Sequence, residues 1–413
     1  MRIDRIALNG FRNYDFETAE FSPGTNVIFG ENAQGKTNLL EAAVYLSCAK
    51  SPRARTEKEM ISFEADAARL TGSVFSRGRD FTVEIELSRG KRRKMSVNQV
   101  PCKRAGDLSG VLNTVYFCPD DLLLIRDGAA ARRRFMDLSL SQLRPRYDAA
   151  LSEYNRLYDH KTRILRDAEE HPSLLDALPD FNLRMAQCGA VLIYYRARFC
   201  KLTPERSLAD YAASAHRECS GGREELTLAY RTVGTVVDPM APQETVFEQL
   251  MAHQRDHYHA ELASRLCLSG PHKDDIEVSI GGAAARVFSS QGQTRTAALS
   301  LKLAERDIFR ELTGFSPVLL LDDVLSELDP RRQEFVLNRI SGGWIILYSL
   351  TGDGDPSRTR AFLDRAQQEG TVLEVCDDLP KSFLVCDHPY HPQIVYLSEL
   401  SSQTLQKRME EAT

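Results

Sequence analysis

Two short motifs, far apart in the chain, constrain its fold more than any other feature. The first runs from Gly30 to Thr37, reads Gly-Glu-Asn-Ala-Gln-Gly-Lys-Thr and follows an apolar run. The second is the apolar run 318–321, which ends in the two carboxylates Asp322 and Asp323. About 280 residues separate the motifs, so one site built from both requires a fold that joins distant segments.

The first motif fits the phosphate-loop pattern G-x-x-x-x-G-K-S/T. Glycines let the backbone approach phosphate oxygens, and the N-terminus of the following helix adds positive potential. Lys36 is predicted to reach the β- and γ-phosphates, and the Thr37 hydroxyl to be a Mg²⁺ ligand. A chance match is the alternative, but helix-forming residues follow Thr37 directly. The predicted phosphate cradle is Gly30, Glu31, Asn32, Ala33, Gln34, Gly35, Lys36 and Thr37.

The second motif places carboxylates at the end of a strand. Asp322 is predicted to bind the metal, directly or through water, and Asp323 to orient or deprotonate the attacking water. The candidate catalytic residues are therefore Lys36, Asp322 and Asp323, and the candidate metal ligands are Thr37 and Asp322. The alternative is a strand that ends in a solvated acidic turn.

Composition limits the class and the compartment of the protein. The 413 residues suffice for two or three domains, and 42% hydrophobic and 27% charged residues are ordinary for a soluble protein. The net charge of −5 excludes a global basic field, although not a local basic patch. The nine cysteines show no zinc-type spacing, and the chain has neither an apolar targeting core nor a membrane-length apolar run. We expect a cytoplasmic protein with no membrane partner.

The middle of the chain has helical periodicity. Apolar residues recur at alternating spacings of three and four from Leu140 to Ile164, with Lys161 as the only polar member, and again from Leu178. Two such stripes separated by a breaker predict an antiparallel helical pair. The pair is either a protruding coiled-coil hairpin or an ordinary globular pair, and Pro145 lies in the first turn or marks a kink.

The distance between the motifs predicts a head that is split in sequence by an insert. Residues 1–125 look strand-rich and carry the phosphate loop, residues 126–270 form a helical insert, and residues 271–350 carry the carboxylates. Residues 351–413 form a C-terminal extension to which the sequence assigns no role. Sheet-like patterns predict strands over 70–75, 81–87, 95–100, 113–118, 225–230, 276–280, 285–288 and 393–397.

A third motif lies between the insert and the carboxylates. Ser290-Gln-Gly-Gln293 precedes Asp322 by about 30 residues and opens a predicted helix. It resembles the signature loop of ABC ATPases, whose serine and glycine backbone contact a phosphate bound by the partner subunit. In this interpretation Ser290, Gly292 and Gln293 bind nucleotide, and residues 326–329 resemble the dimer-contact D-loop.

Together these segments resemble the RecF family of recombination-mediator ATPases, in the chromosome-maintenance branch of the ABC ATPases. The resemblance spans roughly residues 1–350. The segments that carry it are Asn9–Tyr14, Gly30–Thr37, Val115–Leu122, Arg132–Asp137, Gly270–Asp275, Ser290–Gln293 and Leu321–Asp329.

The resemblance implies an α/β fold: an ABC-type P-loop ATPase head with a mixed sheet and an inserted helical arm. It also implies a homodimer that holds ATP and Mg²⁺ between the phosphate loop of one copy and the Ser290 loop of the other. The dimer would bind DNA at single-strand/duplex junctions with little sequence preference. With RecO- and RecR-like partners it would assist RecA loading at gaps. Arg12 is either a phosphate contact or a surface arginine.

Two features depart from the ABC pattern. No histidine occurs near Ser349 or Thr351, where the switch histidine is expected, so the γ-phosphate sensor is unassigned. Asp323 is shorter than the usual glutamate, which suggests slow hydrolysis. Whether the chain is a slow, DNA-stimulated ATPase or a non-hydrolysing nucleotide-dependent scaffold therefore stays open. A transporter-type ABC subunit is a third interpretation, against which the long insert argues.

Basic clusters are the candidate DNA contacts, and each has a structural alternative. Arg132–Arg134 either contacts DNA or pairs with acids on the head. His272 has a catalytic appearance, but the resemblance places it in a structural or nucleotide-proximal turn. The main candidate cluster, whose alternative is a solvated charged hairpin, is Lys91, Arg92, Arg93 and Lys94.

Overall fold

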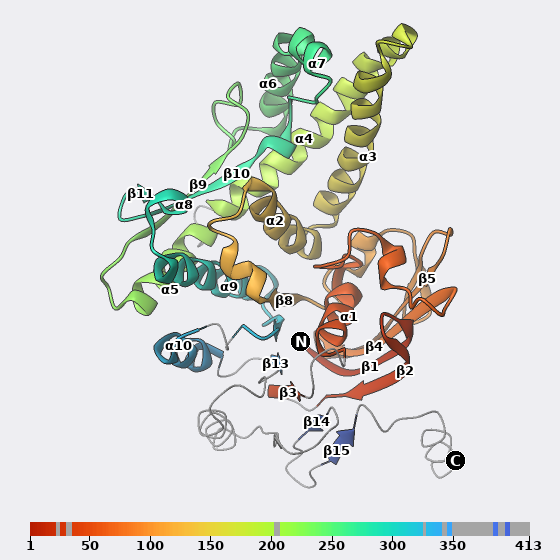
Figure 1. Ribbon diagram of the computed structural model, residues 1–413, viewed down its shortest axis with the longest axis vertical. Helices are drawn as coiled ribbons and strands as arrows, with labels where there is room; N and C mark the ends of the chain where they lie inside the picture. Colours follow the sequence, from red (N-terminus) through yellow and green to blue (C-terminus); the bar gives the residue numbers. More distant parts are fainter. Residues whose placement is uncertain are drawn as a thin grey trace. The chain divides into compact units, whose positions relative to one another are not determined.

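The computed structural model (Figure 1) describes residues 1–21, 25–29, 35–201, 207–324, 328–340, 345–348, 383–386 and 393–396. Its contacts divide the chain into two compact units. The head unit comprises Met1–Asp121 and Phe309–Thr413, and the inserted unit is the continuous stretch Leu122–Ile308. Residues 271–308 thus group with the insert, whereas the sequence places its end at residue 270. The four-part division stays a prediction.

An antiparallel sheet in the head unit has the strand order β2-β1-β4-β5-β6-β7. Buried and exposed residues alternate along β4 and β5, as expected for strands with one face on a core. Arg77 and Gly78 both have positive φ in the two-residue turn between them, which suits the twist of a hairpin. The strands are β1 (Arg2–Phe11), β2 (Tyr14–Glu20), β4 (Ala67–Ser76), β5 (Arg79–Ser88), β6 (Lys94–Val97) and β7 (Val100–Cys102).

A second sheet in the head unit is mixed and has the order β15-β14-β3-β13-β12-β8. Its strands are β3 (Thr25–Phe29), β8 (Thr114–Phe117), β12 (Val318–Leu321), β13 (Ile345–Tyr348), β14 (Phe383–Cys386) and β15 (Gln393–Tyr396). The strands β3, β13, β12 and β8 are parallel, and β14 pairs antiparallel with β3. Parallel strands end at the same sheet edge, so the C-terminal ends of β3 and β12 lie at one edge of the sheet. The predicted mixed sheet and the predicted strand at 393–397 are confirmed.

Helix α1 (Lys36–Cys48) links the two sheets of the head unit. One hydrophobic cluster contains Leu40 of α1, Ile85 of the antiparallel sheet and Leu320 of the mixed sheet. Gly72 permits a close helix–sheet approach, because a Cβ there would lie 2.8 Å from Cδ1 of Leu46. The shorter elements of this part of the chain are η1 (Glu57–Met60), η2 (Ala105–Leu108), η3 (Pro119–Leu123) and α10 (Pro330–Ile340).

The inserted unit is mainly helical. Its helices α3 and α4 pack side by side and have 23 residues each, or about 35 Å at 1.5 Å per residue (Figure 1). Pro145 is the first residue of α3, where a missing N–H costs nothing, so it marks no kink. The helices are α2 (Ala129–Leu143), α3 (Pro145–Asp167), η4 (Pro172–Ala177), α4 (Leu178–Cys200), α5 (Leu208–Ser220), α6 (Gln243–Asp256), α7 (Tyr258–Ser264), η5 (Pro271–Lys273), α8 (Ala285–Phe288) and α9 (Gln291–Thr313).

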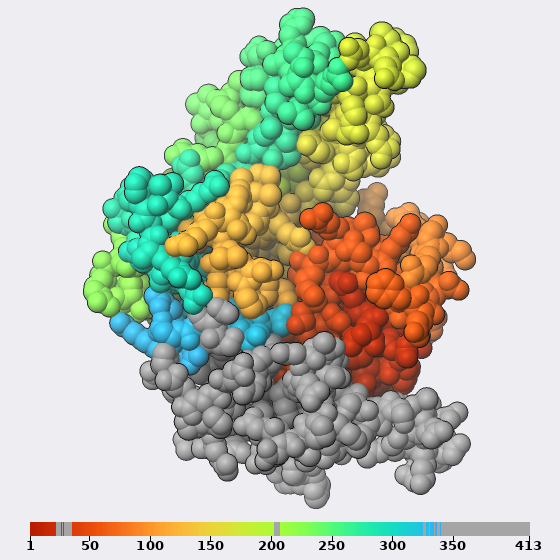
Figure 2. Space-filling model, viewed as in Figure 1, coloured from red at the N-terminus to blue at the C-terminus, as the bar shows by residue number. Residues whose placement is uncertain are grey.

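The predicted helical pair belongs to a larger packed unit. Val246 and Leu250 of α6 share a hydrophobic cluster with Ala190 and Ile193 of α4, so α4 is covered by α6 as well as by α3. The end of α3 and the α6–α7 segment also lie side by side at the top of Figures 1 and 2. Of the two alternatives, the structure therefore supports the globular pair. Within the described ranges, no helix is long and apolar enough to cross a membrane.

A small antiparallel sheet in the inserted unit has the order β11-β10-β9. Its strands β9 (Leu226–Arg231) and β10 (Asp275–Ile280) confirm two predicted strands, and β11 is Ala283–Ala284. The strand predicted at 285–288 is wrong, because these residues form α8 and the Ser289 N–H donates to the Ala285 carbonyl. A run of four residues is too short for its periodicity to distinguish a strand from a helical turn.

Candidate active site

The structure brings the two halves of the predicted site together. Thr37 lies in the first turn of α1, and Asp322 directly follows β12. The Thr37 hydroxyl donates to Oδ1 of Asp322 at 2.9 Å. Asp322 is only 5% exposed. Burial of a carboxylate is costly unless hydrogen-bond donors such as the Thr37 hydroxyl replace its lost water contacts.

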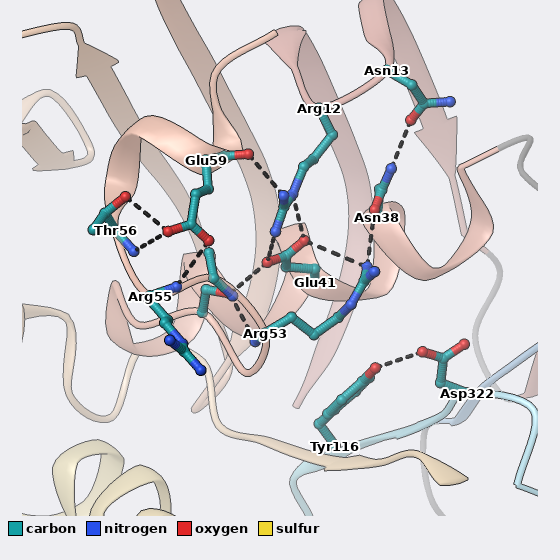
Figure 3. Close-up of polar contacts among 12 residues, drawn as sticks. Arg12, Asn13, Asn38, Glu41, Arg53, Arg55, Thr56, Glu59, Tyr116 and Asp322 are labelled. Carbon is teal, nitrogen blue, oxygen red and sulfur yellow. Dashed lines mark hydrogen bonds and ion pairs between the residues drawn. The ribbon is translucent and has the colours of Figure 1, made fainter. Parts of the chain in front are cut away.

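Tyr116 holds the other oxygen of the same carboxylate. Its hydroxyl donates to Oδ2 of Asp322 at 2.5 Å (Figure 3). Tyr116 lies on β8 and pairs with Leu320 across the parallel ladder, which places its ring beside the end of β12. Burial and the neighbouring Asp322 carboxylate raise the pKa of Tyr116 well above its ordinary value, so the phenol remains a proton donor.

Thr37 and Asp322 suit Mg²⁺. A hydroxyl and a carboxylate are hard oxygen donors, and Mg²⁺ typically combines one or two such protein ligands with phosphate oxygens and water. Elsewhere in the part of the chain that the structure describes, no group of three or more His, Cys, Asp or Glu side chains could hold a metal ion. On the chemistry of their donor atoms, Thr37 and Asp322 are the candidate metal site.

The end of the phosphate loop is closely packed. Gly35 has φ +104°, and a Cβ there would lie 2.7 Å from the side-chain oxygens of Asn13 and Tyr14. Only glycine fits at this position without displacing the side chains of Asn13 and Tyr14. Lys36 begins α1 and is 6% exposed. The other predicted cradle residues, Gly30 to Gln34, lie outside the described residues.

Arg12 is anchored to α1. Its Nε and Nη2 donate to the two carboxylate oxygens of Glu41 at 2.9 and 2.8 Å, and its Nη1 donates to the Glu59 carbonyl at 2.7 Å (Figure 3). Glu41 is fully buried, so this bidentate pair neutralises a carboxylate that water does not reach. The phosphate contact of Arg12 stays a prediction.

Arg53 is a second arginine beside α1, and the sequence analysis missed it. Its Nη1 donates to Oδ1 of Asn38 at 3.0 Å and lies 3.8 Å from Glu41 (Figure 3). The amide of Asn38 in turn donates to Oδ1 of Asn13 at 2.8 Å. The Arg53 side chain is 46% exposed, so it is a cation accessible at the first turn of α1. No spacing rule connects this position to the phosphate loop.

Two aspartates after Asp322 are described by the structure: Asp323 in a left-handed turn and Asp329 at the start of α10. Asp323 has φ +53°, a left-handed conformation that aspartate tolerates better than most residues. Asp329 caps α10, because its Oδ1 accepts from the Arg332 N–H at 3.1 Å. Ser326 and Glu327 of the predicted D-loop lie outside the described residues, as do Ser349 and Thr351.

The predicted signature loop begins α9 in the inserted unit. The Ser290 N–H donates to Oε1 of Gln293 at 2.8 Å, and the Gln293 N–H donates to Oγ of Ser290 at 3.2 Å. This reciprocal pair is a capping box. Ser290 is exposed, so the N-terminus of a long helix and a hydroxyl are presented at the surface of the inserted unit.

The predicted DNA cluster borders a groove of about 620 Å³ along β5, β6 and β7. Arg93 turns inward, where it pairs with Glu57 and donates to the Ala49 carbonyl at 3.1 Å. Lys94 pairs with Glu86 at 3.0 Å. The groove is lined by Arg69, Glu84, Ile85, Glu86, Arg92, Arg93, Lys94, Met95, Ser96, Gln99, Pro101, Cys102 and Lys103. Its charge is therefore mixed, and the DNA contact stays a prediction.

Arg132 has a structural role. Its guanidinium is 4% exposed and forms a bidentate pair with Asp275 at 2.7 and 3.0 Å. It also donates to three backbone carbonyls that precede α2. Of the two alternatives for this arginine, the structure supports an acidic partner, which lies within the inserted unit.

His272 is also a structural residue. Its Nε2 donates to the Cys267 carbonyl at 2.9 Å, so Nδ1 accepts from the Tyr154 hydroxyl at 2.7 Å. Burial lowers the pKa of His272 to about 4, and the ring is neutral at physiological pH. Gly270 has φ +134° and leaves room for Tyr154, because a Cβ there would lie 2.3 Å from its hydroxyl.

Comparisons with known proteins agree with this architecture. The RecF/RecN/SMC N-terminal domain model matches residues 2–343. The DNA replication and repair protein RecF of Agathobacter rectalis is 38% identical over 367 residues, which cover 88% of this chain and 96% of that protein. The corresponding protein of Listeria innocua is 39% identical over 349 residues, covering 83% and 90%. A solved structure of the recombination mediator protein RecF with ATP, in the RecFOR pathway, is 32% identical with a TM-score of 0.76, covering 84% of this chain and 92% of that chain.

The mixed sheet, the helix after the phosphate loop and the carboxylate strand define an ABC-type P-loop ATPase head, here interrupted by a helical insert. Within that class, the chain belongs to the RecF family. The resemblance seen in the sequence is thereby confirmed, together with the predicted fold class.

Proposed function

We propose that this chain is an ATP-dependent DNA-binding protein of recombinational repair and replication restart, acting in the cytoplasm. The observation that carries the proposal is the 2.9 Å contact between Thr37 and Asp322, since it brings together the two motifs proposed to hold phosphate and metal. The names of its relatives, DNA replication and repair protein and recombination mediator, support the same biological role.

The chemistry follows from the residues at the strand ends. Lys36 binds the β- and γ-phosphates at the N-terminus of α1, and Thr37 and Asp322 hold Mg²⁺. Bound Mg²⁺ supplies positive charge that stabilises the phosphoryl oxygens. Asp323 orients the attacking water and accepts its proton. Tyr116 keeps the Asp322 carboxylate in one orientation through its bond to Oδ2.

The proposed active form is a two-fold homodimer. The loop Ser290–Gln293 of one copy contacts the phosphate held by the other copy, so ATP binding closes the dimer and hydrolysis opens it. The closed dimer binds DNA at single-strand/duplex junctions. RecO- and RecR-like partners then cooperate with it in loading RecA at gaps.

DNA contact is proposed for the exposed cations near the β6–β7 hairpin. Lys91, Arg92 and Lys94 are exposed at its entry, whereas the half-buried Arg93 forms an ion pair with Glu57. Such cations contact the phosphate backbone and confer little sequence preference. Each contact that forms adds to the salt dependence of binding.

Sedimentation with and without ATP and gapped DNA tests the proposal. The wild type should dimerise with ATP and co-sediment with gapped DNA. Lys36→Ala should remain monomeric, and Lys58→Ala, which changes an exposed lysine of the same unit, should behave like the wild type. An ATP-independent sedimentation coefficient in the wild type, or an unchanged ATP-dependent dimer in Lys36→Ala, would rule out the sandwich.

A further inference from the structure

The carboxylate of Glu224 connects two segments of the inserted unit. Its Oε1 accepts a hydrogen bond from Nε2 of Gln293 at 3.0 Å, and its Oε2 lies 3.1 Å from Nε2 of His216. Glu224 lies in the turn between α5 and β9, His216 is a fully buried residue of α5, and Gln293 lies in the first turn of α9. The start of α9 is thus attached to a buried side chain of α5.

The oxygen and the nitrogen of the Gln293 side-chain amide both form hydrogen bonds. A carboxylate only accepts hydrogen bonds, so the amide group that faces Glu224 is the NH₂. Its oxygen therefore faces the Ser290 N–H, at 2.8 Å. Glu224 thereby selects the amide orientation that completes the capping box of Ser290 and Gln293. Without that partner, the amide can rotate about its side-chain bonds.

We propose that Glu224 is a positioning residue for the loop Ser290–Gln293, acting through the Gln293 side chain. The inference rests on the proposed function, in which this loop contacts the nucleotide of the second copy. A loop held in its binding geometry loses less entropy when phosphate docks than an unrestrained loop. Glu224 itself does not touch phosphate, because a carboxylate repels that anion.

The first test measures dimerisation. Glu224→Ala should raise the ATP concentration for half-maximal dimerisation by about 5- to 10-fold, the equivalent of one net hydrogen bond. Binding of a fluorescent ATP analogue to the monomer should not change, since the phosphate loop of the same copy is intact. Glu224→Gln keeps an accepting oxygen for Gln293 and should stay within about twofold of the wild type.

Glu277→Ala is the matched control, because it removes another carboxylate of the inserted unit that pairs only on the surface with Arg231. Gln293→Ala should lose at least as much as Glu224→Ala, and the double variant should lose no more than Gln293→Ala alone. Additive losses, or wild-type dimerisation of Glu224→Ala, would overturn the inference.

The second test does not depend on dimers. Hydrogen–deuterium exchange of the ATP-free protein should show faster exchange at residues 289–294 in Glu224→Ala, with β9 and β10 unchanged. Equal exchange would refute the positioning role even if dimerisation changed. If the wild type failed to dimerise while exchange rose as expected, the sandwich would fail and the positioning role would stand.

Discussion

The Thr37 hydroxyl lies 2.9 Å from Oδ1 of Asp322, although 285 positions separate the two residues. The strand order β3-β13-β12-β8 makes this possible, because all four strands are parallel and end at one sheet edge. The same order brings the Tyr116 hydroxyl to the other oxygen of Asp322. The site thus depends on the register of strands that lie far apart in the sequence, at residues 25–29, 114–117, 318–321 and 345–348.

Replacing Tyr116 by Phe should weaken Mg²⁺ binding. The change removes the hydroxyl that donates to Oδ2 of Asp322, so the buried carboxylate is held less firmly in one orientation. The Mg²⁺ concentration needed for half-maximal binding of a fluorescent ATP analogue should rise about tenfold, the usual effect of losing a partner of a metal ligand. Tyr45→Phe removes a hydroxyl that bonds to Glu57 instead, and should leave the Mg²⁺ dependence unchanged. An identical titration for both variants would argue against the role of Tyr116.

Replacing Asp323 by Asn should prolong the life of ATP-bound dimers. Asparagine also tolerates the left-handed backbone found at this position, so the variant should fold like the wild type. It cannot accept a proton from water, so hydrolysis should fall by two or more orders of magnitude, roughly the contribution of a general base. Dimer lifetime after removal of free ATP, followed by size-exclusion chromatography, checks this. A wild-type lifetime would favour the non-hydrolysing scaffold.

Replacing Glu17 by Gln should stabilise the protein more at pH 8 than at pH 5. Glu17 is 4% exposed, and burial raises its pKa to about 7, against a smaller lowering by the Thr18 N–H. The folded state therefore binds the proton more tightly than the unfolded chain, in which the Glu17 carboxyl has a pKa of 4.5. The stability that Glu17 contributes is fully present below pH 4.5 and is lost as the pH rises through about 7.

Glutamine mimics the neutral carboxyl, so the gain in unfolding free energy should be about 2 kcal/mol larger at pH 8 than at pH 5. Urea unfolding at the two pH values measures the difference. Glu20→Gln changes an exposed residue of the same strand and should show little pH dependence. A gain of equal size at both pH values would contradict the assignment.

Replacing Lys161 by Met should destabilise the protein by about 3–5 kcal/mol, because it leaves the carboxylate of Glu261 buried without its cation. Both side chains are almost fully buried, and their charged atoms lie 2.6 Å apart. Adding Glu261→Gln should restore much of the loss, since the amide oxygen still accepts from the Leu268 N–H. Urea unfolding of the single and double variants tests this coupling.

The surface pair Arg231 and Glu277 provides the comparison for that experiment. Its side chains are 63% and 55% exposed, so Arg231→Met should cost less than about 1 kcal/mol. Equal losses for Lys161→Met and Arg231→Met would show that burial does not set the difference between the two pairs.

Much of the architecture followed from local patterns in the sequence. The strand–loop–helix order around Lys36, the run 318–321 and the stripes of the two long helices all rest on neighbours within a few positions. Lys161 breaks its apolar stripe, and the structure explains it by a partner on α7. The strand predicted at 285–288 is a helix in the structure, because a run of four residues is too short for its periodicity to distinguish the two.

Reading the residues alone identifies the chemical groups: a phosphate loop, two carboxylates, a signature-like loop and an insert between them. Which of these side chains meet depends on the folded structure, because hydrogen bonds and ion pairs between distant residues depend on strand order and helix packing. Tyr116 on Asp322, Arg12 on Glu41 and Glu224 on Gln293 are partnerships of this kind. Each joins residues whose spacing in the chain follows no helical or strand period, so no local pattern could have revealed it.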